Sequence, residues 1–444
     1  MTMSYRQAET YLLGTINETV SRRLPYRLER MKAFMRELGD PQNTYPTVHI
    51  GGTSGKGSTS TMVATVLQSS GKRVGLHTKP HLRSMTERAR VDGVAIEEER
   101  FAELLQSMMP AIDSVAEQHG RPTYYETLLA LAFKYFAEEH VDVAVIEVGL
   151  GGRLDGTNVI VPRVAAITSV GYDHMDVLGD ALEDIAAEKA GIAKPDVPLV
   201  VAVDDAVARG VIIEHAVATG APLTLVDDAA TIDVLPSARF GQHFTITTAQ
   251  GRYDLSVPVL GEFQRRNATT AVLALERIGD DLRPSIEDVE RGFANLAIPG
   301  RMETFPGHPA VIFDIAHNAE KAEHLAMSLR ESFPDRHITY VVAIGQSKDA
   351  GEILRALASL PSNFIFTAFS AAGRASTKPQ RLANIAESIG AWGRAIVDPI
   401  EALTIARRNA GPDEIVVVTG STFVVAELRA WWLENVGDAR PSRT

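Results

Sequence analysis

Apolar residues between positions 47 and 204 fall into short runs that are separated by segments with helical spacing. The runs are TVHIGG, RVGLHT, VDVAVIEVG, VAAITSVG and PLVVAVD, and residues 97–118 and 123–140 carry apolar positions at the spacing of helices. Near-continuous apolar strands that alternate with helices are typical of a parallel sheet covered on both faces. The pattern therefore predicts a doubly wound α/β domain.

The pattern changes between residues 231 and 260. The segment FTITTAQGRYDLSVPV alternates apolar and polar positions around Gln250-Gly251, which predicts a small antiparallel hairpin. Residues 262–278 and 285–295 return to helical spacing, so we expect two helices after the hairpin.

A Pro-Gly pair within residues 297–301 predicts a hinge, because a new strand-helix series begins beyond it. The new apolar runs are VIFDI, ITYVVAIG, NFIFTAF, AIV and IVVVTGS. They predict a five-stranded, Rossmann-like α/β unit. We therefore expect two domains, residues 1–297 and a smaller one at residues 298–444.

Composition and charge exclude several classes of protein. The formal net charge of −12 argues against a nucleic-acid binder, and the absence of cysteine excludes disulfides and thiolate metal sites. The N-terminus shows no basic segment followed by an apolar stretch, and no apolar run reaches the length of a membrane span. We therefore expect a cytoplasmic protein with no membrane partner.

A glycine-rich loop, G-G-T-S-G-K-G-S at residues 51–58, lies between a predicted strand and a predicted helix. Such loops surround phosphate oxygens with backbone N–H groups, and the following helix adds its positive N-terminal end. Lys56 would reach the β- and γ-phosphates, and the Ser58 hydroxyl would reach Mg²⁺. The strict G-x4-G-K-[ST] spacing is not met, because Gly57 precedes Ser58. We assign ATP contacts to Gly52, Thr53, Ser54, Gly55, Lys56, Gly57 and Ser58.

Further polar residues lie at the ends of predicted elements. Glu147 ends a buried strand, where it could bind Mg²⁺ or could simply be a polar strand end. The glycines of G-L-G-G-R-L-D, residues 149–155, suggest a backbone that approaches a ligand. His174 is a candidate metal ligand or a solvated loop residue. Lys189 lies near the end of a helix, where the helix dipole favours a surface lysine.

Together these motifs resemble the folylpolyglutamate synthase and dihydrofolate synthase family of the Mur ligase superfamily. The resemblance spans roughly residues 25–430. It also rests on six further motifs, which occur in the same order as in the family: D-H-M-D-V-L-G, A-A-E-K-A-G-I, L-G-E-F-Q-R-R-N-A, P-G-R-M-E, D-I-A-H-N and T-G-S-T-F. It implies an ATP-binding central domain and a C-terminal glutamate ligase domain. It also implies a monomeric ligase that forms an acyl phosphate on a folate or dihydropteroate and then adds L-glutamate.

The resemblance assigns roles to individual residues. Ser58, Glu147 and His174 resemble the residues that bind one or two Mg²⁺ ions. Lys189 is similar in position to a lysine that is carbamylated in the family. The resemblance implies that Lys56, Lys189 and His317 take part in catalysis. It implies that Asn267, Arg301 and Asp314 contact the nucleotide, and that Asp155 binds the pterin side of the acceptor.

The chain also departs from the family pattern. Lys79 stands in Thr78-Lys79-Pro80-His81, where the usual T-S-P-H carries a magnesium-binding serine. The usual D-G-A-H-N-P is D-I-A-H-N-A at residues 314–319, and Ser54 stands where asparagine is common. Two alternatives therefore stay open: a Mur-like ligase that acts on another carboxylate, and a nucleotide-binding protein that does not ligate.

Overall fold

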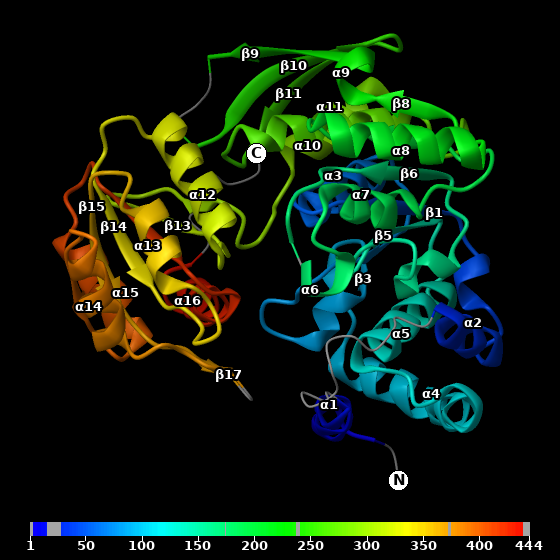
Figure 1. Cartoon of the computed structure of the whole chain (residues 1–444), viewed down its shortest axis with the longest axis horizontal. Coiled ribbons are helices and arrows are strands. Elements are labelled where there is room, and N and C mark those ends of the chain that lie inside the picture. The colour runs from blue at the N-terminus through cyan, green and yellow to red at the C-terminus, as the bar shows by residue number, and fades with distance from the viewer. Residues whose placement is uncertain (1–2, 16–27, 174, 237–239, 372–373, 438–444) are drawn as a thin grey trace. The chain divides into compact units, whose positions relative to one another are not determined.

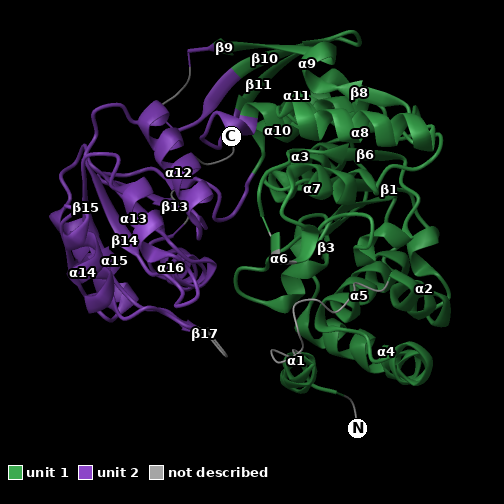
Figure 2. Cartoon of the chain, viewed as in Figure 1, with its two compact units in different colours: residues 1–234, 244–256, 265–296 green, residues 235–243, 257–264, 297–444 purple. Residues whose placement is uncertain are grey.

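The computed structural model describes residues 3–15, 28–173, 175–236, 240–371 and 374–437 (Figure 1). The chain forms two compact units (Figure 2). Unit 1 comprises Met1–Val234, Phe244–Ser256 and Arg265–Leu296, and unit 2 comprises Leu235–His243, Val257–Gln264 and Ala297–Thr444. Two short segments at the predicted hairpin thus cluster with unit 2, and the division between residues 297 and 298 stays a prediction.

The main sheet of unit 1 has eight strands within the described residues. They are β1 (Thr47–Gly51), β2 (Val74–His77), β3 (Arg90–Val91), β4 (Val94–Ala95), β5 (Val143–Glu147), β6 (Val164–Ile167), β7 (Leu199–Val201) and β8 (Leu223–Leu225). Their order is β4-β3-β2-β5-β1-β6-β7-β8, and all pairs are parallel except β2-β3 and β3-β4. The predicted doubly wound parallel sheet is confirmed, since all five predicted runs are strands in it.

Helices cover both faces of this sheet. The helices that lie wholly or mainly in unit 1 are α1 (Tyr5–Gly14), α2 (Leu28–Glu37), α3 (Lys56–Ser69), α4 (Glu98–His119), α5 (Tyr124–Glu138), α6 (Met175–Leu178), α7 (Leu182–Ala190), α8 (Ala206–Thr219), α9 (Val226–Ala229), α10 (Phe263–Glu276) and α11 (Ile286–Ala294), and some of them pack on other helices rather than on the sheet. One core cluster joins α5 to Ala144 and Ile146 of β5, and another joins α7 and α8 to Ala165 and Ile167 of β6. α3 packs against β1, β2 and β5 and against α11.

A local signal fixes the start of α5, which borders the site described below. The Thr123 hydroxyl accepts a hydrogen bond from the Glu126 backbone N–H at 3.2 Å, and the Glu126 carboxylate accepts one from the Thr123 N–H at 2.8 Å. This reciprocal capping box satisfies two N–H groups at the helix start. Arg30 of α2 also pairs with the largely buried Glu126 at 2.9 Å, which ties the two helices together.

The predicted hairpin is present in a separate three-stranded sheet with the order β11-β10-β9. Its strands are β9 (Ala230–Leu235), β10 (Gln242–Thr248) and β11 (Arg252–Val257). β10 and β11 meet at the predicted Gln250-Gly251 turn, which closes with a 2.9 Å hydrogen bond from the Thr248 N–H to the Gly251 carbonyl. The burial of alternate residues in β11, Tyr253, Leu255 and Val257, matches the alternating pattern.

Unit 2 is a second α/β sandwich. Its strands are β12 (Glu303–Phe305), β13 (Ala310–Phe313), β14 (Ile338–Val342), β15 (Ser362–Phe366), β16 (Ser370–Ala371), β17 (Arg374–Ala375), β18 (Gly393–Ala395) and β19 (Ile415–Thr419). Its helices are α12 (Ala319–Ser332), α13 (Ala350–Leu357), α14 (Pro379–Ser388), α15 (Pro399–Asn409) and α16 (Thr422–Asn435). The main sheet has the order β12-β13-β19-β14-β15-β18 and is parallel except for β12. Four of the predicted runs are strands, and the fourth run, AIV at residues 395–397, overlaps β18 only at Ala395. The prediction also missed the antiparallel edge strand β12.

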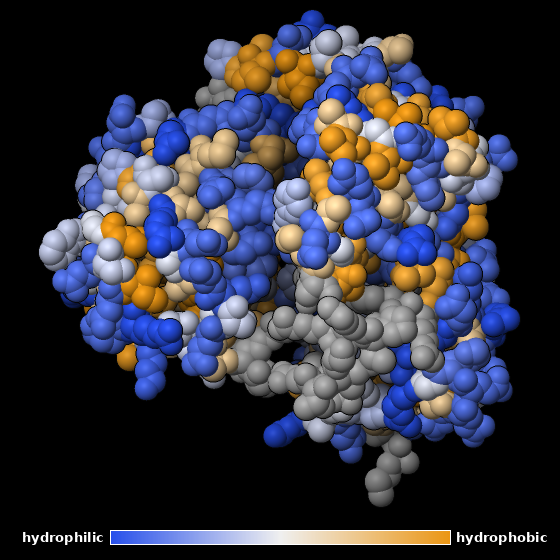
Figure 3. All heavy atoms as spheres, in the orientation of Figure 1, coloured by the Kyte–Doolittle hydropathy of each residue, from blue (hydrophilic) through white to orange (hydrophobic). Residues whose placement is uncertain are grey.

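The surface of the chain is mixed. On the face drawn in Figure 3, apolar residues are interspersed with polar and charged ones. None of the helices in the described ranges combines the length and the apolar character that crossing a membrane requires. The apolar residues are concentrated inside each unit, around the two main sheets.

Candidate active site

The topology of unit 1 brings the predicted site residues to one edge of its sheet. Strands β2, β5, β1 and β6 are parallel neighbours, so their carboxyl ends lie side by side. Ile50 is in register with Glu147, and Gly51 with Ile167. Open α/β sheets bind ligands at this edge. The phosphate loop, Glu147, residues 78–79 and residues 168–173 all follow these strand ends.

The phosphate loop turns from β1 directly into α3. Gly52 and Gly55 have φ values of +138° and +84°, which side chains other than glycine rarely adopt. Gly55 caps the helix, so α3 begins at Lys56 and its first backbone N–H groups face the loop. The Lys56 ammonium donates to the carbonyls of Gly52 at 2.7 Å and Thr53 at 3.0 Å. Ser58 is buried in the first turn of α3.

The end of β6 supports the loop from behind. The Thr53 N–H donates to the Ser169 carbonyl at 2.9 Å, and the Ser54 N–H donates to the Ser169 hydroxyl at 2.9 Å. The Thr168 hydroxyl donates to the Ser54 carbonyl at 2.6 Å. These hydrogen bonds hold the loop in one conformation, so its backbone is already arranged to bind an anion.

Asn267, at the start of α10, lies beside the phosphate loop within unit 1. A Cβ atom on Gly55 would collide with the Asn267 side-chain oxygen, so the loop and the amide are in close contact. Asn267 is buried. Next to it, Arg266 pairs with Asp227 at 2.6 Å and donates to the Ala202 carbonyl at 3.0 Å, which anchors this end of the helix.

Glu147 is buried at the end of β5 and also faces the loop. A Cβ atom on Gly57 would lie 3.3 Å from its Oε2 atom, and the same oxygen accepts a hydrogen bond from the Lys79 backbone N–H at 2.9 Å. A carboxylate and the Ser58 hydroxyl are hard oxygen donors, which suit Mg²⁺. Within the ranges described, no three or more His, Asp or Glu side chains converge as a metal site. His174 lies outside the described residues.

Lys189 lies on α7 with 3% of its surface exposed, so it is not the surface lysine that its helix-end position alone favoured. The pKa of its ammonium is lowered to about 8, mainly by burial, and the charge of Lys79 acts in the same direction. Asp173 and Glu188 act in the opposite direction. A buried lysine with this pKa is present partly as the neutral amine near pH 7.

The glycines of residues 149–152 serve protein packing, in contrast to the ligand approach that their spacing suggested. A Cβ atom on Gly152 would lie 2.7 Å from the Glu188 carbonyl oxygen and 3.0 Å from that of Lys189. A Cβ atom on Gly149 would collide with Tyr125. The absence of side chains therefore lets this loop press against α5 and against the end of α7 that carries Lys189.

Asp155 is buried and accepts hydrogen bonds from the protein on both carboxylate oxygens. Its Oδ1 accepts from the Thr157 N–H at 2.9 Å, the Thr157 hydroxyl at 2.6 Å and the Tyr125 hydroxyl at 3.1 Å. Its Oδ2 accepts from the Leu150 N–H at 2.8 Å. Thr157 continues the network to His49 of β1 at 2.9 Å. In this structure Asp155 organises the glycine loop, and the pterin-side role implied by the resemblance stays a prediction.

Unit 2 brings together Arg301, Asp314 and His317. Asp314 accepts hydrogen bonds from the backbone N–H groups of Met302 and Ala316, both at 2.9 Å. Burial raises the pKa of its carboxyl, and the charge of Arg301 opposes this rise. The His317 Nδ1–H donates to the Ile315 carbonyl at 2.8 Å. Burial lowers the pKa of His317 to about 4, so it is neutral at pH 7.

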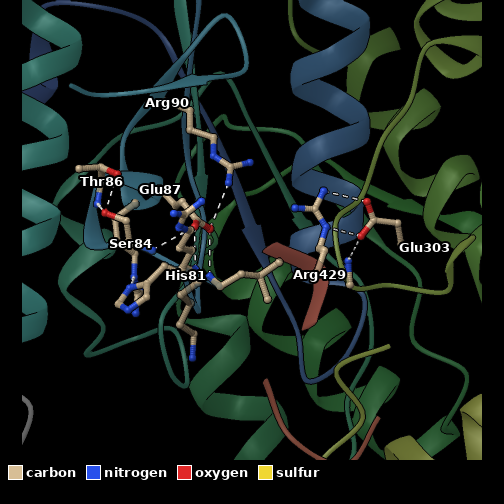
Figure 4. Close-up of polar contacts among 12 residues, drawn as sticks. His81, Ser84, Thr86, Glu87, Arg90, Glu303 and Arg429 are labelled. Atoms are coloured by element: carbon tan, nitrogen blue, oxygen red, sulfur yellow. Dashed lines mark hydrogen bonds and ion pairs between the residues drawn. The ribbon is translucent and has the colours of Figure 1, made fainter. Parts of the chain in front are cut away.

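Sequence reasoning missed the ion pair that holds the Arg301 turn. The Arg429 guanidinium of α16 donates to both oxygens of the buried Glu303, at 2.6 and 2.8 Å (Figure 4). Glu303 also accepts from the Gly300 N–H at 2.9 Å. The turn that presents Arg301 is therefore fixed on one side by Glu303 and on the other by Asp314. The P-G-R-M-E motif contains this glutamate, but no local pattern indicates its partner.

Sequence reasoning also missed the role of Glu87 in the loop after β2. The Glu87 carboxylate accepts backbone hydrogen bonds from Leu82, Arg83 and Ser84, at 2.8 to 3.1 Å. Arg90 pairs with the same carboxylate at 3.3 Å (Figure 4). The loop that starts at Lys79 is therefore folded around one carboxylate.

Comparisons with known proteins agree with this geometry. Residues 50–275 match the Mur ligase middle domain, and residues 300–422 match the Mur ligase, glutamate ligase domain. The chain is 34% identical over 437 residues to the dihydrofolate synthase/folylpolyglutamate synthase of Bacillus subtilis, which covers 97% of this chain and 99% of that protein.

Two solved structures share the fold over nearly the whole chain. Mycobacterium tuberculosis folylpolyglutamate synthase, complexed with ADP and AMPPCP, has a TM-score of 0.85 and 31% identity, with 96% and 98% of the two chains covered. Escherichia coli FolC, in complex with DHPP and ADP, has a TM-score of 0.84 and 28% identity, with 96% and 97% covered. These findings favour a folate ligase over the two alternatives that the sequence left open. The chain belongs to the folylpolyglutamate synthase and dihydrofolate synthase family of Mur ligases, which are ATP-dependent acid–amino-acid ligases.

Proposed function

We propose that this chain joins L-glutamate to the carboxylate of a folate or dihydropteroate through an acyl phosphate formed with ATP. The observation that carries the proposal is the meeting of the phosphate loop, Asn267 and Glu147 at one sheet edge of a Mur ligase family member. The relatives described above bind ADP, AMPPCP or DHPP, which supports small-molecule substrates of the same kinds.

The nucleotide phosphates bind the N–H groups of residues 52–58 and the N-terminal end of α3. Lys56 exchanges its two carbonyl acceptors in the loop for phosphate oxygens. Asn267 lies against the loop at Gly55. Ser58 and Glu147 would hold Mg²⁺, with His174 as a further candidate ligand. The ion would neutralise phosphate charge while the acceptor carboxylate approaches.

Lys189 is proposed to be carbamylated. Its neutral amine adds to CO₂, a new N–C bond forms, and a proton is released, so a buried cation becomes an anion. The lowered pKa supports this step because it raises the share of neutral amine. The carbamate oxygens could support a magnesium ion or the acyl phosphate.

Unit 2 is proposed to bind glutamate and to contact the nucleotide. Arg301, Lys321 and Lys348 all act electrostatically on His317, so this corner of unit 2 is rich in positive charge. Glutamate carries two carboxylates and ATP carries phosphates, which such a corner attracts. Arg301 and Asp314 would contact the nucleotide, while His317 would act at the reacting groups.

A phosphate-release assay tests the proposal. ATP, Mg²⁺ and L-glutamate are incubated with dihydropteroate, with tetrahydrofolate, or with no acceptor. Phosphate release that requires both glutamate and one of these acceptors is expected. Release that needs no acceptor, or that occurs only with an unrelated carboxylate, would contradict the proposed substrate.

Three further proposals concern organisation. The protein acts as a monomer in the cytoplasm, with residues 1–297 as the central ATP-binding domain and residues 298–444 as the glutamate ligase domain. Light scattering on the purified chain measures its mass in solution. A mass of twice the 48.1 kDa chain would contradict the monomer.

A further inference from the structure

Arg88 occupies a fixed position at the sheet edge that carries the site. It ends the short 3-10 helix Met85–Arg88, just before β3, which pairs with β2. Its backbone carbonyl lies 2.7 Å from the His77 Nδ1 atom, and because a carbonyl can only accept, Nδ1 donates. His77 is fully buried and is the last residue of β2. The backbone of Arg88 is therefore held at the carboxyl end of a central strand.

The guanidinium of Arg88 has no carboxylate partner among the residues that the structure describes. Its one hydrogen bond there runs from Nε to His81 Nδ1, at 3.1 Å. Arg90, two positions further on, does pair with Glu87. Burial lowers the pKa of Arg88. Electrostatic interactions with Tyr124, Tyr125, Glu147 and Glu87 raise this pKa, but they offset the effect of burial only in part. Arg88 is partly buried. A cation that has lost much of its water is normally paired, so one without a carboxylate partner among the described residues indicates an anion that is still to bind.

The surroundings of Arg88 indicate which anion this is. Glu147 and Tyr125 both interact electrostatically with the Arg88 guanidinium. Glu147 lies against Gly57 of the phosphate loop, and Tyr125 lies beside the Gly149 loop at the start of α5. Arg88 therefore lies near the place where phosphates would bind, although the phosphates already have the loop N–H groups and Lys56. A second anion has to reach the γ-phosphate in this reaction, and that anion is the acceptor carboxylate.

We propose that Arg88 binds the carboxylate of the acceptor and holds it for phosphorylation, an inference that rests on the proposed function. The remaining guanidinium N–H groups suit a carboxylate, which arginine binds with two parallel hydrogen bonds. One carboxylate oxygen attacks the γ-phosphorus, and a new O–P bond forms. The bond from that phosphorus to the β–γ bridging oxygen breaks, and its electron pair leaves with ADP. No proton moves, and Arg88 reduces the repulsion between the two anions.

Binding measurements with a matched pair of ligands test this role. The probes are dihydropteroate and its carboxamide, which differ in the carboxylate alone, with a non-hydrolysable ATP analogue present. Wild-type protein should bind the acid about 10- to 100-fold more tightly than the amide, the range expected for hydrogen bonds between charged groups. Arg88→Gln should bind both at the weaker affinity, and its affinity for the ATP analogue should change by less than about twofold.

Two further variants control the experiment. Arg163→Gln removes the same charge from an exposed pair with Asp281 and should retain the preference for the acid. Arg88→Lys keeps the charge but loses the paired hydrogen bonds, so its preference should be intermediate. If thermal unfolding shows that Arg88→Gln does not fold, the same comparison is made with Arg88→Lys.

The outcomes separate this inference from the proposed function. If wild-type protein ligates glutamate but Arg88→Gln still prefers the acid, Arg88 does not bind the acceptor. If the variant loses affinity for the ATP analogue instead, Arg88 contacts phosphate, which also overturns the inference. If wild-type protein ligates neither dihydropteroate nor tetrahydrofolate, the proposed function is wrong, and this inference falls with it.

Discussion

The buried pair of Glu303 and Arg429 should be a main source of stability in unit 2. Arg429→Met removes the guanidinium but keeps most of the side-chain volume. It leaves a carboxylate with 6% of its surface exposed, whose one remaining hydrogen bond in the described residues comes from the Gly300 N–H. Removing one partner of a buried ion pair lowers the free energy of unfolding by about 3–5 kcal/mol. The combined change Glu303→Met with Arg429→Met should recover more than half of that loss, because no charge is then left buried.

Urea unfolding followed by tryptophan fluorescence measures this effect within unit 2. All three tryptophans of the chain, at positions 392, 431 and 432, lie in unit 2, and two of them are on α16 with Arg429. The control is Arg336→Met, which breaks an exposed pair with Asp413 and should cost about 1 kcal/mol or less.

The same change should also affect nucleotide binding if Arg301 contacts ATP. Glu303 holds the Gly300 N–H directly before Arg301, so loss of the pair loosens the turn. The KM for ATP should rise in Arg429→Met, while Arg336→Met should leave it unchanged. A loss below about 1 kcal/mol for Arg429→Met, with no recovery in the double variant, would refute the reasoning about the pair.

Three predictions concern lysines of unit 1. Lys56→Ala should abolish ligation and cost little stability, since its ammonium donates to carbonyls of its own loop; ligase turnover retained by this variant would remove the phosphate-loop assignment. Because the pKa of Lys189 is about 8, its neutral fraction rises from about a tenth at pH 7 to about nine tenths at pH 9. At constant dissolved CO₂ labelled with carbon-13, a carbamate NMR signal should therefore grow with pH and be absent in Lys189→Arg; a signal that persists in this variant comes from another group. Lys79→Ser should make turnover and ATP affinity more dependent on magnesium. The Lys79 backbone N–H donates to Glu147, and the Lys79 ammonium lowers the pKa of Lys189, so the side-chain charge that is removed lies near the site. Coinciding magnesium titrations of the two proteins would show that Lys79 takes no part in phosphate neutralisation.

The central strands and the phosphate loop could be predicted from the sequence because their signals are local. Each buried parallel strand is a continuous apolar run, and the glycine loop lies between such a run and a helix. The short strands β3, β4, β8 and β12, at or next to the sheet edges, were missed, since segments of two or three residues show no periodicity. Their existence depends on a neighbouring strand that offers free backbone groups.

The environment of each site residue could not be predicted, because distant segments create it. Lys189 is buried, and Gly152 of a distant loop packs against the backbone of the helix end that carries it. Glu303 and Arg429 are 126 positions apart, so no local pattern links them. The family resemblance assigned roles to residues in its motifs, and those roles stay predictions. The hydrogen bonds of Asp155, and the lack of a carboxylate partner for Arg88 among the described residues, emerged only from the packed structure.

Ligation with labelled acceptor tests the central claim most directly. Dihydropteroate or tetrahydrofolate carrying oxygen-18 in the acceptor carboxylate is incubated with ATP, Mg²⁺ and L-glutamate, and both products are examined by mass spectrometry. We predict an acceptor heavier by one glutamate residue and one oxygen-18 atom in the released phosphate, because the acyl phosphate passes a carboxylate oxygen to phosphorus. A glutamylated product with unlabelled phosphate would contradict the acyl phosphate, and the absence of any glutamylated product would contradict the ligase itself.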